Sequence, residues 1–491
     1  MRRLLAMALV LLFAAGCMQG ADRQGAFEEA QRAVDDAARH VLALDHDEAD
    51  GHRDAALHQG SFNMQLVGYS NGIDGSGDPN RIPRRGAFNE IALRDHYAYL
   101  SRTSDDGSFG GFSVVDVADP AHPQVVGDFR AQGGSDVEVS DDGALAFLST
   151  QRNTPDQTLG ALKQTQDPAT GLGRGVYIVS LADPAHPALD NFVPLPYNGP
   201  HTLTYYHHPD GDEYLFVCTY DLVTDPGTGA ITAAAPATQR LLVYLLQRNP
   251  APGAVPGLPG AALLPVAQYQ KVPPASARLV FPHDTSVTTN AAGQVVVDVA
   301  YWDLGVRLLD FTHPPGPSAD IALAPPLPEI GSFTDFAPSA FNNIHFAKSF
   351  AEPMLLNGTV RQVTVAEPEI ITADHETGQL TFLDTTDATQ PTKVSWWTLP
   401  AQEPPLGVTD LDFSPHNFDT WDGKVAVAHY HAGVWVVDLS TPEDLVHPRE
   451  VGFYMTAKAR ADSPALQPDA WSVKQKDGLL YASDEASGLY I

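Results

Sequence analysis

The chain has 491 residues, of which 43% are hydrophobic, and this proportion is sufficient for a large buried core and excludes a disordered chain. Its 60 acidic and 29 basic residues give a net charge of −31, which argues against a nucleic-acid partner because phosphate binding requires a basic face. The two cysteines, Cys17 and Cys218, are too few for a disulfide framework. We expect Cys218, in the apolar run YLFVCTY, to be a buried core residue.

The amino terminus has the layout of a signal peptide. MRRLLAMALVLLFAAGCMQG places two arginines before a short apolar run and small residues, and the run is too short to span a membrane. Residues 1–16 are therefore predicted to be a signal peptide. The segment ending at Cys17 resembles a bacterial lipobox, although Ala14 stands where leucine is usual. This resemblance implies a lipid anchor on Cys17, with the protein held at the cell envelope by that anchor alone, or otherwise secreted.

Residues 17–59 are rich in Ala, Asp, Glu and Arg, with apolar residues at roughly helical spacing in AFEEAQRAVDDAARHVLAL. We interpret them as a partly helical tether that precedes the folded domain at residues 60–491.

A self-similar unit recurs from about residue 60 onward. One half of it is a strand, an aspartate, a proline-bearing turn and a second strand, as in GFSVVDVADPAHPQVVGDF and GVWVVDLSTPEDLVHPREVGFY. The other half is a hairpin, as in SDVEVSDDGALAFLS and PHNFDTWDGKVAVAHY. Each unit thus supplies four antiparallel strands, named a to d. Seven units are predicted, which begin at Asn89, Asp136, His201, His283, His345, His416 and Asp469.

The repeat resembles the LVIVD repeat of bacterial and archaeal extracytoplasmic proteins over most of residues 60–491. The likeness is carried by the glycine, the alternating apolar residues and the Val-Asp and Asp-Pro pairs of segments such as GFSVVDVADP and GVWVVDLSTP. This resemblance implies a β-propeller and no particular activity.

The chain ends at GLYI (488–491), which is only the start of a strand c in the seventh unit. The segment FNMQLVGYSN (62–71) has no unit of its own and suits the missing outer strand. We therefore predict an all-β, seven-bladed β-propeller that is closed by an N-terminal strand in the last blade, since an unpaired edge would invite aggregation. The protein is expected to be a monomer.

The start of strand a and the end of strand b lie on the same face of a propeller, so the chemistry-bearing residues at these positions should converge there. Four consecutive units begin with histidine, and imidazole nitrogens suit Cu, Fe and Zn. The predicted metal ligands are His201, His283, His345, His416, His429 and His431. The predicted ligand-binding residues are Asp136, Tyr301, Trp302, Asp303, Asp374, His375, Glu376 and Asp469.

Two functions fit this sequence. The first is an exported, lipid-anchored binding module that holds a protein, a glycan or a small ligand on its histidine-rich face. The alternative is an oxidase or lyase that depends on a transition metal (Cu, Fe or Zn) held by the histidines at the mouth of the central channel. The second hypothesis rests on analogy, because the histidine pattern is similar to that of copper-dependent thiol oxidases related to selenium-binding proteins.

Overall fold

The computed structural model describes residues 61–73, 88–103, 110–131, 133–150, 175–195, 199–219, 222–224, 231–233, 239–248, 260–272, 279–336, 343–356, 358–370, 378–399, 413–456, 468–485 and 487–491. The predicted signal peptide (1–16), Cys17 and the predicted tether (17–59) lie outside these residues. No helix in the described part of the chain is long and apolar enough to span a membrane.

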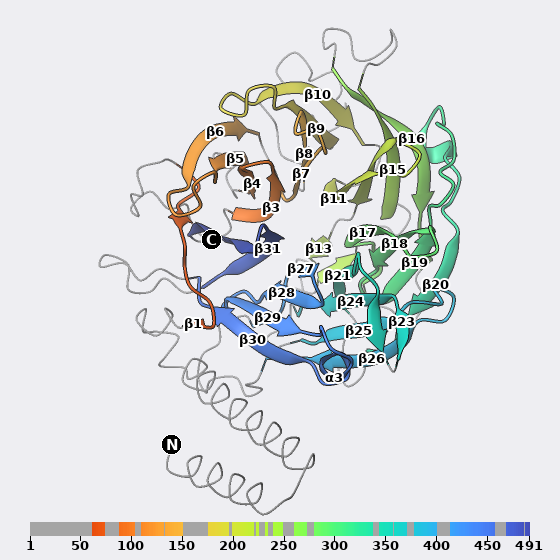
Figure 1. Cartoon of the computed structure of the whole chain (residues 1–491). Helices are drawn as coiled ribbons and strands as arrows, with labels where there is room; N and C mark the ends of the chain where they lie inside the picture. The colour runs from red at the N-terminus through yellow and green to blue at the C-terminus, as the bar shows by residue number, and fades with distance from the viewer. Residues whose placement is uncertain are drawn as a thin grey trace, which may run out of the picture.

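Six four-stranded sheets and one five-stranded sheet, all antiparallel, surround a central axis (Figure 1). They form the seven blades of the predicted propeller. Blade one contains β3 (Phe88–Arg94), β4 (Tyr97–Arg102), β5 (Gly111–Asp116) and β6 (Gln124–Arg130), and blade two contains β7 (Val137–Val139), β8 (Leu145–Ser149), β9 (Gly175–Ser180) and β10 (Ala188–Pro194). Blade three contains β11 (Pro200–His207), β12 (Glu213–Thr219), β15 (Arg240–Gln247) and β16 (Ala262–Tyr269). Blade four contains β17 (Asp284–Thr289), β18 (Val295–Ala300), β19 (Val306–Asp310) and β20 (Glu329–Phe333).

Blade five contains β21 (Ile344–Ser349), β24 (Val363–Pro368), β25 (Leu380–Asp384) and β26 (Thr392–Trp397). Blade six contains β27 (Phe418–Trp421), β28 (Lys424–Ala428), β29 (Val434–Asp438), β30 (Arg449–Tyr454) and β1 (Ser61–Phe62). Blade seven contains β31 (Ala470–Lys476), β32 (Leu479–Asp484), β33 (Gly488–Tyr490) and β2 (Tyr69–Ser70). The innermost strand of blade seven, β31, contacts the innermost strand of blade one, β3, so the blades make a closed circle. The prediction of seven blades is therefore confirmed.

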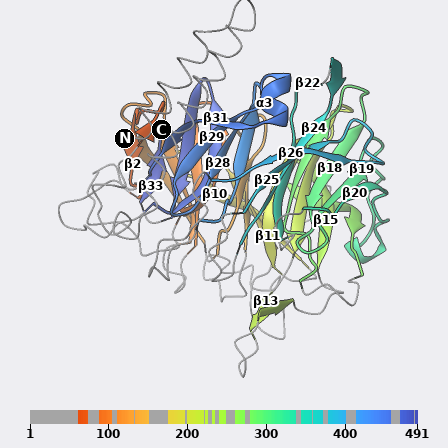
Figure 2. The same cartoon turned by 90° about the horizontal axis from the view of Figure 1, so that it is seen from below.

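Two hairpins extend the blades at opposite faces of the ring. In blade three, β13 (Leu222–Thr224) pairs with β14 (Ile231–Ala233), and in blade five β22 (Met354–Leu356) pairs with β23 (Thr359–Arg361). Figure 2 shows the ring from the side, with β13 projecting from one face and β22 standing at the other. The described helices are short, namely η6 (Ile321–Leu323) and α3 (Pro442–Val446).

The repeated Asp-Pro motif forms the turn between strands c and d. In blade one, Asp116 accepts a hydrogen bond from the backbone N–H of Ala118, and Asp119 accepts one from that of Ala121. An aspartate that bonds the N–H two residues ahead stabilises a turn, which explains why the motif recurs. The strands before these turns are buried between neighbouring blades, and every residue of β9 before Ser180 is buried.

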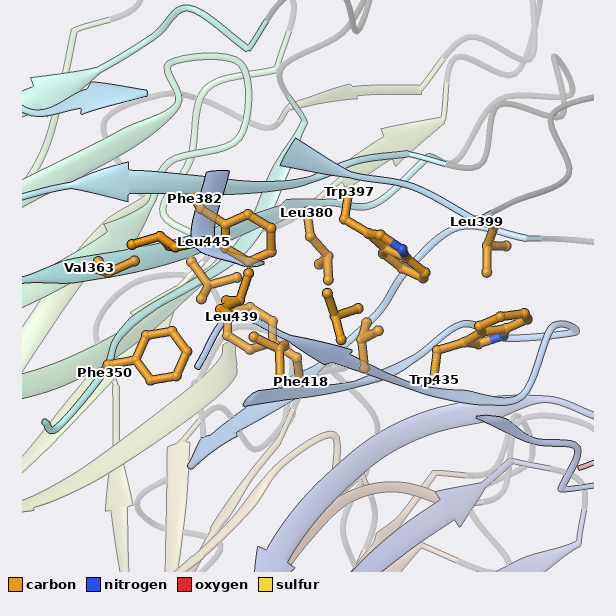
Figure 3. Close-up of a cluster of buried hydrophobic side chains, with 14 of the residues drawn as sticks. Phe350, Val363, Leu380, Phe382, Trp397, Leu399, Phe418, Trp435, Leu439 and Leu445 are labelled. Atoms are coloured by element: carbon orange, nitrogen blue, oxygen red, sulfur yellow. The ribbon is translucent and has the colours of Figure 1, made fainter. Parts of the chain in front are cut away.

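Apolar side chains at the blade interfaces make up the core. Between blades five and six, Phe382 and Trp397 pack in one cluster with Phe418 and Trp435, and Leu445 of α3 lies at the same interface (Figure 3). Cys218 belongs to the corresponding cluster of blades three and four and is 1% exposed, so the prediction that it is a core residue is confirmed.

The N-terminal segment is divided between two blades. Ser61 and Phe62 pair with Tyr454 and Phe453 at the outer edge of blade six, whereas Tyr69 and Ser70 pair with β33 of blade seven. Asn63 has a φ of 51°, a left-handed conformation that asparagine tolerates, and β1 ends just before it. The sequence predicted one strand over 62–71 in the last blade; the left-handed turn instead ends the first pairing early and leaves a short second one.

Candidate metal centre

Histidines from four consecutive blades form a continuous row of rings. The ring centroids of His201 and His283 are 4.4 Å apart, those of His283 and His345 4.0 Å, and those of His345 and His416 4.1 Å. Trp471 of blade seven extends the row, with its ring 3.9 Å from that of His416. All four histidines are buried. The structure thus brings together the four histidines that begin predicted units.

Irregular pairing at the start of the innermost strands places two of these rings. The ladder shifts register between Pro200 and Thr202 and between Ile344 and Phe346, so that His201 and His345 are the extra residues of β-bulges. A bulged residue leaves the alternation of the strand, and its side chain is re-aimed. In blades four and six no register shift occurs, and His283 and His416 instead lie just before β17 and β27. The four side chains meet in one row because each stands at the start of the innermost strand of its blade.

Backbone and carboxylate acceptors fix the orientation of three rings. The Nδ1 atom of His283 lies 3.1 Å from the carbonyl oxygen of His345, and Nδ1 of His416 lies 2.8 Å from that of Trp471. A carbonyl oxygen can only accept, so these Nδ1 atoms carry the hydrogen and the Nε2 atoms keep a lone pair. Nδ1 of His345 lies 2.7 Å from the buried Glu367 carboxylate. A ring N–H held by a carbonyl or carboxylate is the usual support of a metal-binding histidine.

The Nε2 atoms of the row lie close to one another. His201 Nε2 and His283 Nε2 are 3.0 Å apart, a hydrogen-bond distance at which His201 donates to the lone pair of His283. His283, His345 and Glu369 each offer one ligand atom, and these three atoms all lie within 4.8 Å of one another. Glu369 Oε2 is 4.0 Å from His345 Nε2, and its Oε1 accepts a hydrogen bond of 2.5 Å from the Tyr430 hydroxyl. The arrangement therefore offers nitrogen and oxygen donors from neighbouring blades to one point.

Burial keeps the histidines neutral. It lowers the pKa of His201 and of His416 to about 3, and it lowers those of His283 and His345 well below the ordinary value, with a further contribution from the neighbouring histidines. Neutral imidazole is the form that binds a metal. Burial, and secondly the charge of Glu369, raise the pKa of Glu367 well above its usual range. A cation placed among these groups would offset that repulsion.

Blades four and six have the same turn between strands b and c. In YWDLG (301–305) the backbone N–H of Tyr301 donates to the carbonyl oxygen of Gly305, and in HYHAG (429–433) that of His429 donates to Gly433. The second residue is left-handed in both, with φ values of 29° at Trp302 and 34° at Tyr430. This conformation is strained for a bulky residue and is often retained at functional sites. Trp302 packs against His283 at 5.1 Å between centroids, and Tyr430 against His416 at 5.2 Å.

The equivalence of the two turns also explains where His429 lies. It takes the place of Tyr301, which is part of the core between blades three and four. His429 accordingly packs against Trp397, and its Nδ1 lies 3.1 Å from the carbonyl oxygen of Phe413. Its contacts are with the interface of blades five and six. Burial lowers its pKa to about 4. His431, which is also buried, takes the place of Asp303.

The remaining predicted ligand-binding residues have varied surroundings. Tyr301 accepts a hydrogen bond from the N–H of Lys271, and Asp303 accepts one from that of Leu279. Asp469 donates its backbone N–H to Asp484. Asp136 accepts the backbone N–H of Leu203 and lines a polar cavity of 190 Å³ together with, among others, Glu90, Glu138, Asp284 and Lys474.

The predicted residues Asp374, His375 and Glu376 lie outside the described residues. The sequence placed the end of strand b of blade five beside them, but β24 ends at Pro368. Glu367 and Glu369 occupy this strand end and were missed for that reason. Tyr430 and Trp471 were missed as well, although comparison of HYHAG with YWDLG aligns Tyr430 with the predicted residue Trp302.

Comparisons with known proteins find only weak structural likenesses. No family model matches the sequence, and no curated protein matches it. The β-propeller domain of Cps50 (Swd1) from Myceliophteria thermophila is 11% identical, with 84% of this chain and 97% of that chain covered and a TM-score of 0.43. The periplasmic gluconolactonase PpgL of Pseudomonas aeruginosa is 14% identical, with 77% and 92% covered and a TM-score of 0.41. A functionally unknown protein from Desulfotomaculum acetoxidans is 12% identical, with 75% and 85% covered and a TM-score of 0.42. These likenesses are too weak to carry an argument about function.

Proposed function

We propose that this β-propeller is an exported cell-envelope binding module whose histidine-rich face holds a transition-metal ion. His283 and His345 would bind the ion through Nε2, with Glu369 as an oxygen ligand and His201 as a further nitrogen ligand. His416 would stand next to this set. The proposal makes the metal the small ligand that the face binds.

One observation carries this proposal, namely that the Nε2 atoms of His201 and His283, which lie in two blades, meet at 3.0 Å in a hydrogen bond. A bound ion would replace this hydrogen bond, and the His201 hydrogen would then lie on Nδ1, which is 3.5 Å from Ser135 Oγ. Two metal–nitrogen bonds of about 2.1 Å that span the 3.0 Å between the two Nε2 atoms would meet at roughly 90°. That is the angle between neighbouring ligands in tetragonal or octahedral coordination. The spacing therefore favours copper(II) or octahedral iron over tetrahedral zinc among the three candidate metals.

The surroundings of the ligands support the same proposal. With a cation bound, Glu367 would be ionised and would hold the Nδ1 hydrogen of His345, and the backbone carbonyl of His345 holds that of His283. Both supports would orient a lone pair toward the ion and raise its basicity. A divalent cation would also supply positive charge beside the buried carboxylates of Glu367 and Glu369.

The cellular context of the proposal rests on the sequence. Residues 1–16 have the layout of a signal peptide, and Cys17 follows a segment similar to a lipobox. We infer export, with a lipid anchor at Cys17 and no other membrane contact. We also propose membership of the LVIVD repeat proteins, and that the N-terminal segment closes the ring of the monomer through its pairing with β33.

The test is the metal content of the purified protein. We expect about one copper or iron ion per chain after loading and dialysis, and loss of that ion in His283→Ala and in His345→Ala. The matched control is His186→Ala, because the His186 side chain is 83% exposed in a surface turn. Folded protein that takes up no metal, or variants that bind as much as the control does, would rule out the proposed site.

A metal-dependent oxidase or lyase is a second candidate function. The observation that favours it is the number of protein ligands, since His283, His345 and Glu369, with His201 as the fourth, would leave positions of an octahedral ion unfilled. Catalytic metal sites characteristically keep a position open for water or substrate. The test is oxygen consumption with a small thiol by the copper-loaded chain, and a rate equal to that of His283→Ala would exclude this oxidase activity.

A further inference from the structure

The indole N–H of Trp302 is buried without an acceptor. The residue is 2% exposed, and its Nε1 has no hydrogen-bond partner among the described residues. Its backbone is also held in the left-handed region, at a φ of 29°. An unsatisfied buried donor and a strained backbone both destabilise the fold, so their combination at one residue requires an explanation.

Three other tryptophans, one in each of blades five, six and seven, have hydrogen-bond acceptors for their indole N–H groups. Nε1 of Trp435 donates to the carbonyl oxygen of Ala432 at 2.8 Å, and that of Trp397 donates to Glu450 at 3.3 Å. Trp471 hydrogen-bonds to Glu90. This fold therefore finds partners for buried indoles, and the missing partner of Trp302 is particular to its position.

That position adjoins the candidate metal centre. The Trp302 ring packs against both Phe281, at 5.0 Å between centroids, and His283, at 5.1 Å. Tyr430 occupies the equivalent turn position of blade six, and its polar atom donates to Glu369 of the metal group. The Tyr430 hydroxyl thus donates to a proposed metal ligand, whereas the Trp302 indole N–H has no acceptor among the described residues.

We propose that the indole N–H of Trp302 donates a hydrogen bond to a small anion bound to the metal beside His283. The inference rests on the proposed metal site. An indole is a donor only, so the missing group must be an acceptor. An acceptor that is also drawn to a transition metal is an anion or the carboxylate of a small substrate. Trp302 would then determine which ligands the open coordination position accepts.

The experiment uses copper(II)-loaded full-length protein and sodium azide, whose charge-transfer absorption reports binding to copper. The test variant is Trp302→Phe, which keeps an aromatic ring against His283 and removes the N–H. The matched control is Trp435→Phe, which makes the same change at an indole that already has a protein acceptor. Copper affinity is measured in the same samples.

We expect Trp302→Phe to weaken azide binding about tenfold, equivalent to about 1.4 kcal/mol, with copper affinity unchanged, and Trp435→Phe to leave azide binding unaltered. Equal azide affinity in wild type and Trp302→Phe, with copper bound in both, would overturn this inference and leave the metal site standing. Failure of the wild type to bind copper would overturn the proposed function, and this inference with it.

Two further measurements do not depend on the copper spectrum. Without metal, Trp302→Phe should lose less stability to urea than Trp435→Phe, because both lose the same ring volume but only Trp435 loses a hydrogen bond. An equal loss would mean that the Trp302 N–H has a partner in the protein, against the inference. In wild type with ¹⁵N-labelled indoles, with zinc used as the diamagnetic ion and its binding shown by metal analysis, azide should shift one of the six tryptophan signals, the one absent from Trp302→Phe. No shift in the zinc-bound protein would contradict the proposal.

Discussion

Removal of residues 61–70 tests whether the N-terminal segment closes the ring. This segment pairs with β30 through Ser61 and Phe62 and with β33 through Tyr69 and Ser70. Without it the outer edges of both blades would be exposed to solvent. Exposed strand edges pair with other chains, so we expect both lower stability and association of the variant.

The magnitude follows from the contacts of the segment. Val67 and Gly68 donate their N–H groups to the carbonyl oxygen of Ile491, the N–H of Ile491 donates to Gly68, and the Tyr69 hydroxyl donates to Ser487. These four hydrogen bonds at about 1 kcal/mol each, with about 1 kcal/mol for the Tyr69–Tyr490 ring pair, give about 5 kcal/mol. The sum leaves out the ladder pairs of β1 and β2 and the exposed hydrogen bond from Asn63 to Val451. The entropy of ordering the segment reduces this figure. We expect a loss of about 2 to 5 kcal/mol.

Urea unfolding and light scattering measure the two effects. The control is deletion of residues 20–50, which leaves the segment in place and should change neither the unfolding midpoint nor the oligomeric state. If the chain without residues 61–70 stays monomeric with the wild-type midpoint, the segment does not close the ring and the reasoning is refuted.

Three further predictions concern single residues. Phe418→Ala should lower the free energy of unfolding by about 3–5 kcal/mol in urea titrations, because the ring is fully buried between blades five and six, whereas alanine at the 40% exposed Trp396 should change it by far less. Without metal, the contribution of His429 to the free energy of unfolding should decrease as the pH is lowered. Its folded pKa of about 4 lies below the unfolded value near 6.5, so the unfolded state gains the proton first on acidification. From pH 7 to pH 5 the stability advantage of wild type over His429→Gln should therefore shrink by about 2 kcal/mol, and a constant difference would contradict this. Glu367→Gln should weaken metal binding about 10–100-fold in calorimetric titrations by loosening the His345 ring, and unchanged affinity would exclude that support.

Local signals allowed the blades to be predicted. The Asp-Pro turns and hairpins are short-range features, and each encodes two strands without reference to the rest of the chain. The position of His283 relative to His345 also followed, since equivalent residues of neighbouring repeats occupy equivalent places in a ring. The β-bulge that leaves His201 and His345 outside the ladder had no visible signal, and it occurs in blades three and five but not in blades four and six.

Features that depend on contacts between distant parts of the chain could not be predicted from local signals. The division of 61–70 between blades depends on the left-handed turn at Asn63 and on which outer edge lies within reach. Strand alternation alone placed His429 with His431, whereas the likeness of its turn to YWDLG, in which Tyr301 is a core residue, indicates the contacts that His429 makes at the blade interface. Glu367 and Glu369 were missed because the end of β24 was placed several residues too late.

A crystal structure of the copper-loaded protein, with anomalous scattering recorded at the copper edge, tests the central claim most directly. The account predicts one strong peak at about 2.0–2.1 Å from the Nε2 atoms of His283 and His345, on the side where His201 and Glu369 lie. Absence of a peak there, or a peak only at exposed histidines such as His186, would contradict the claim that the histidine row is a metal centre.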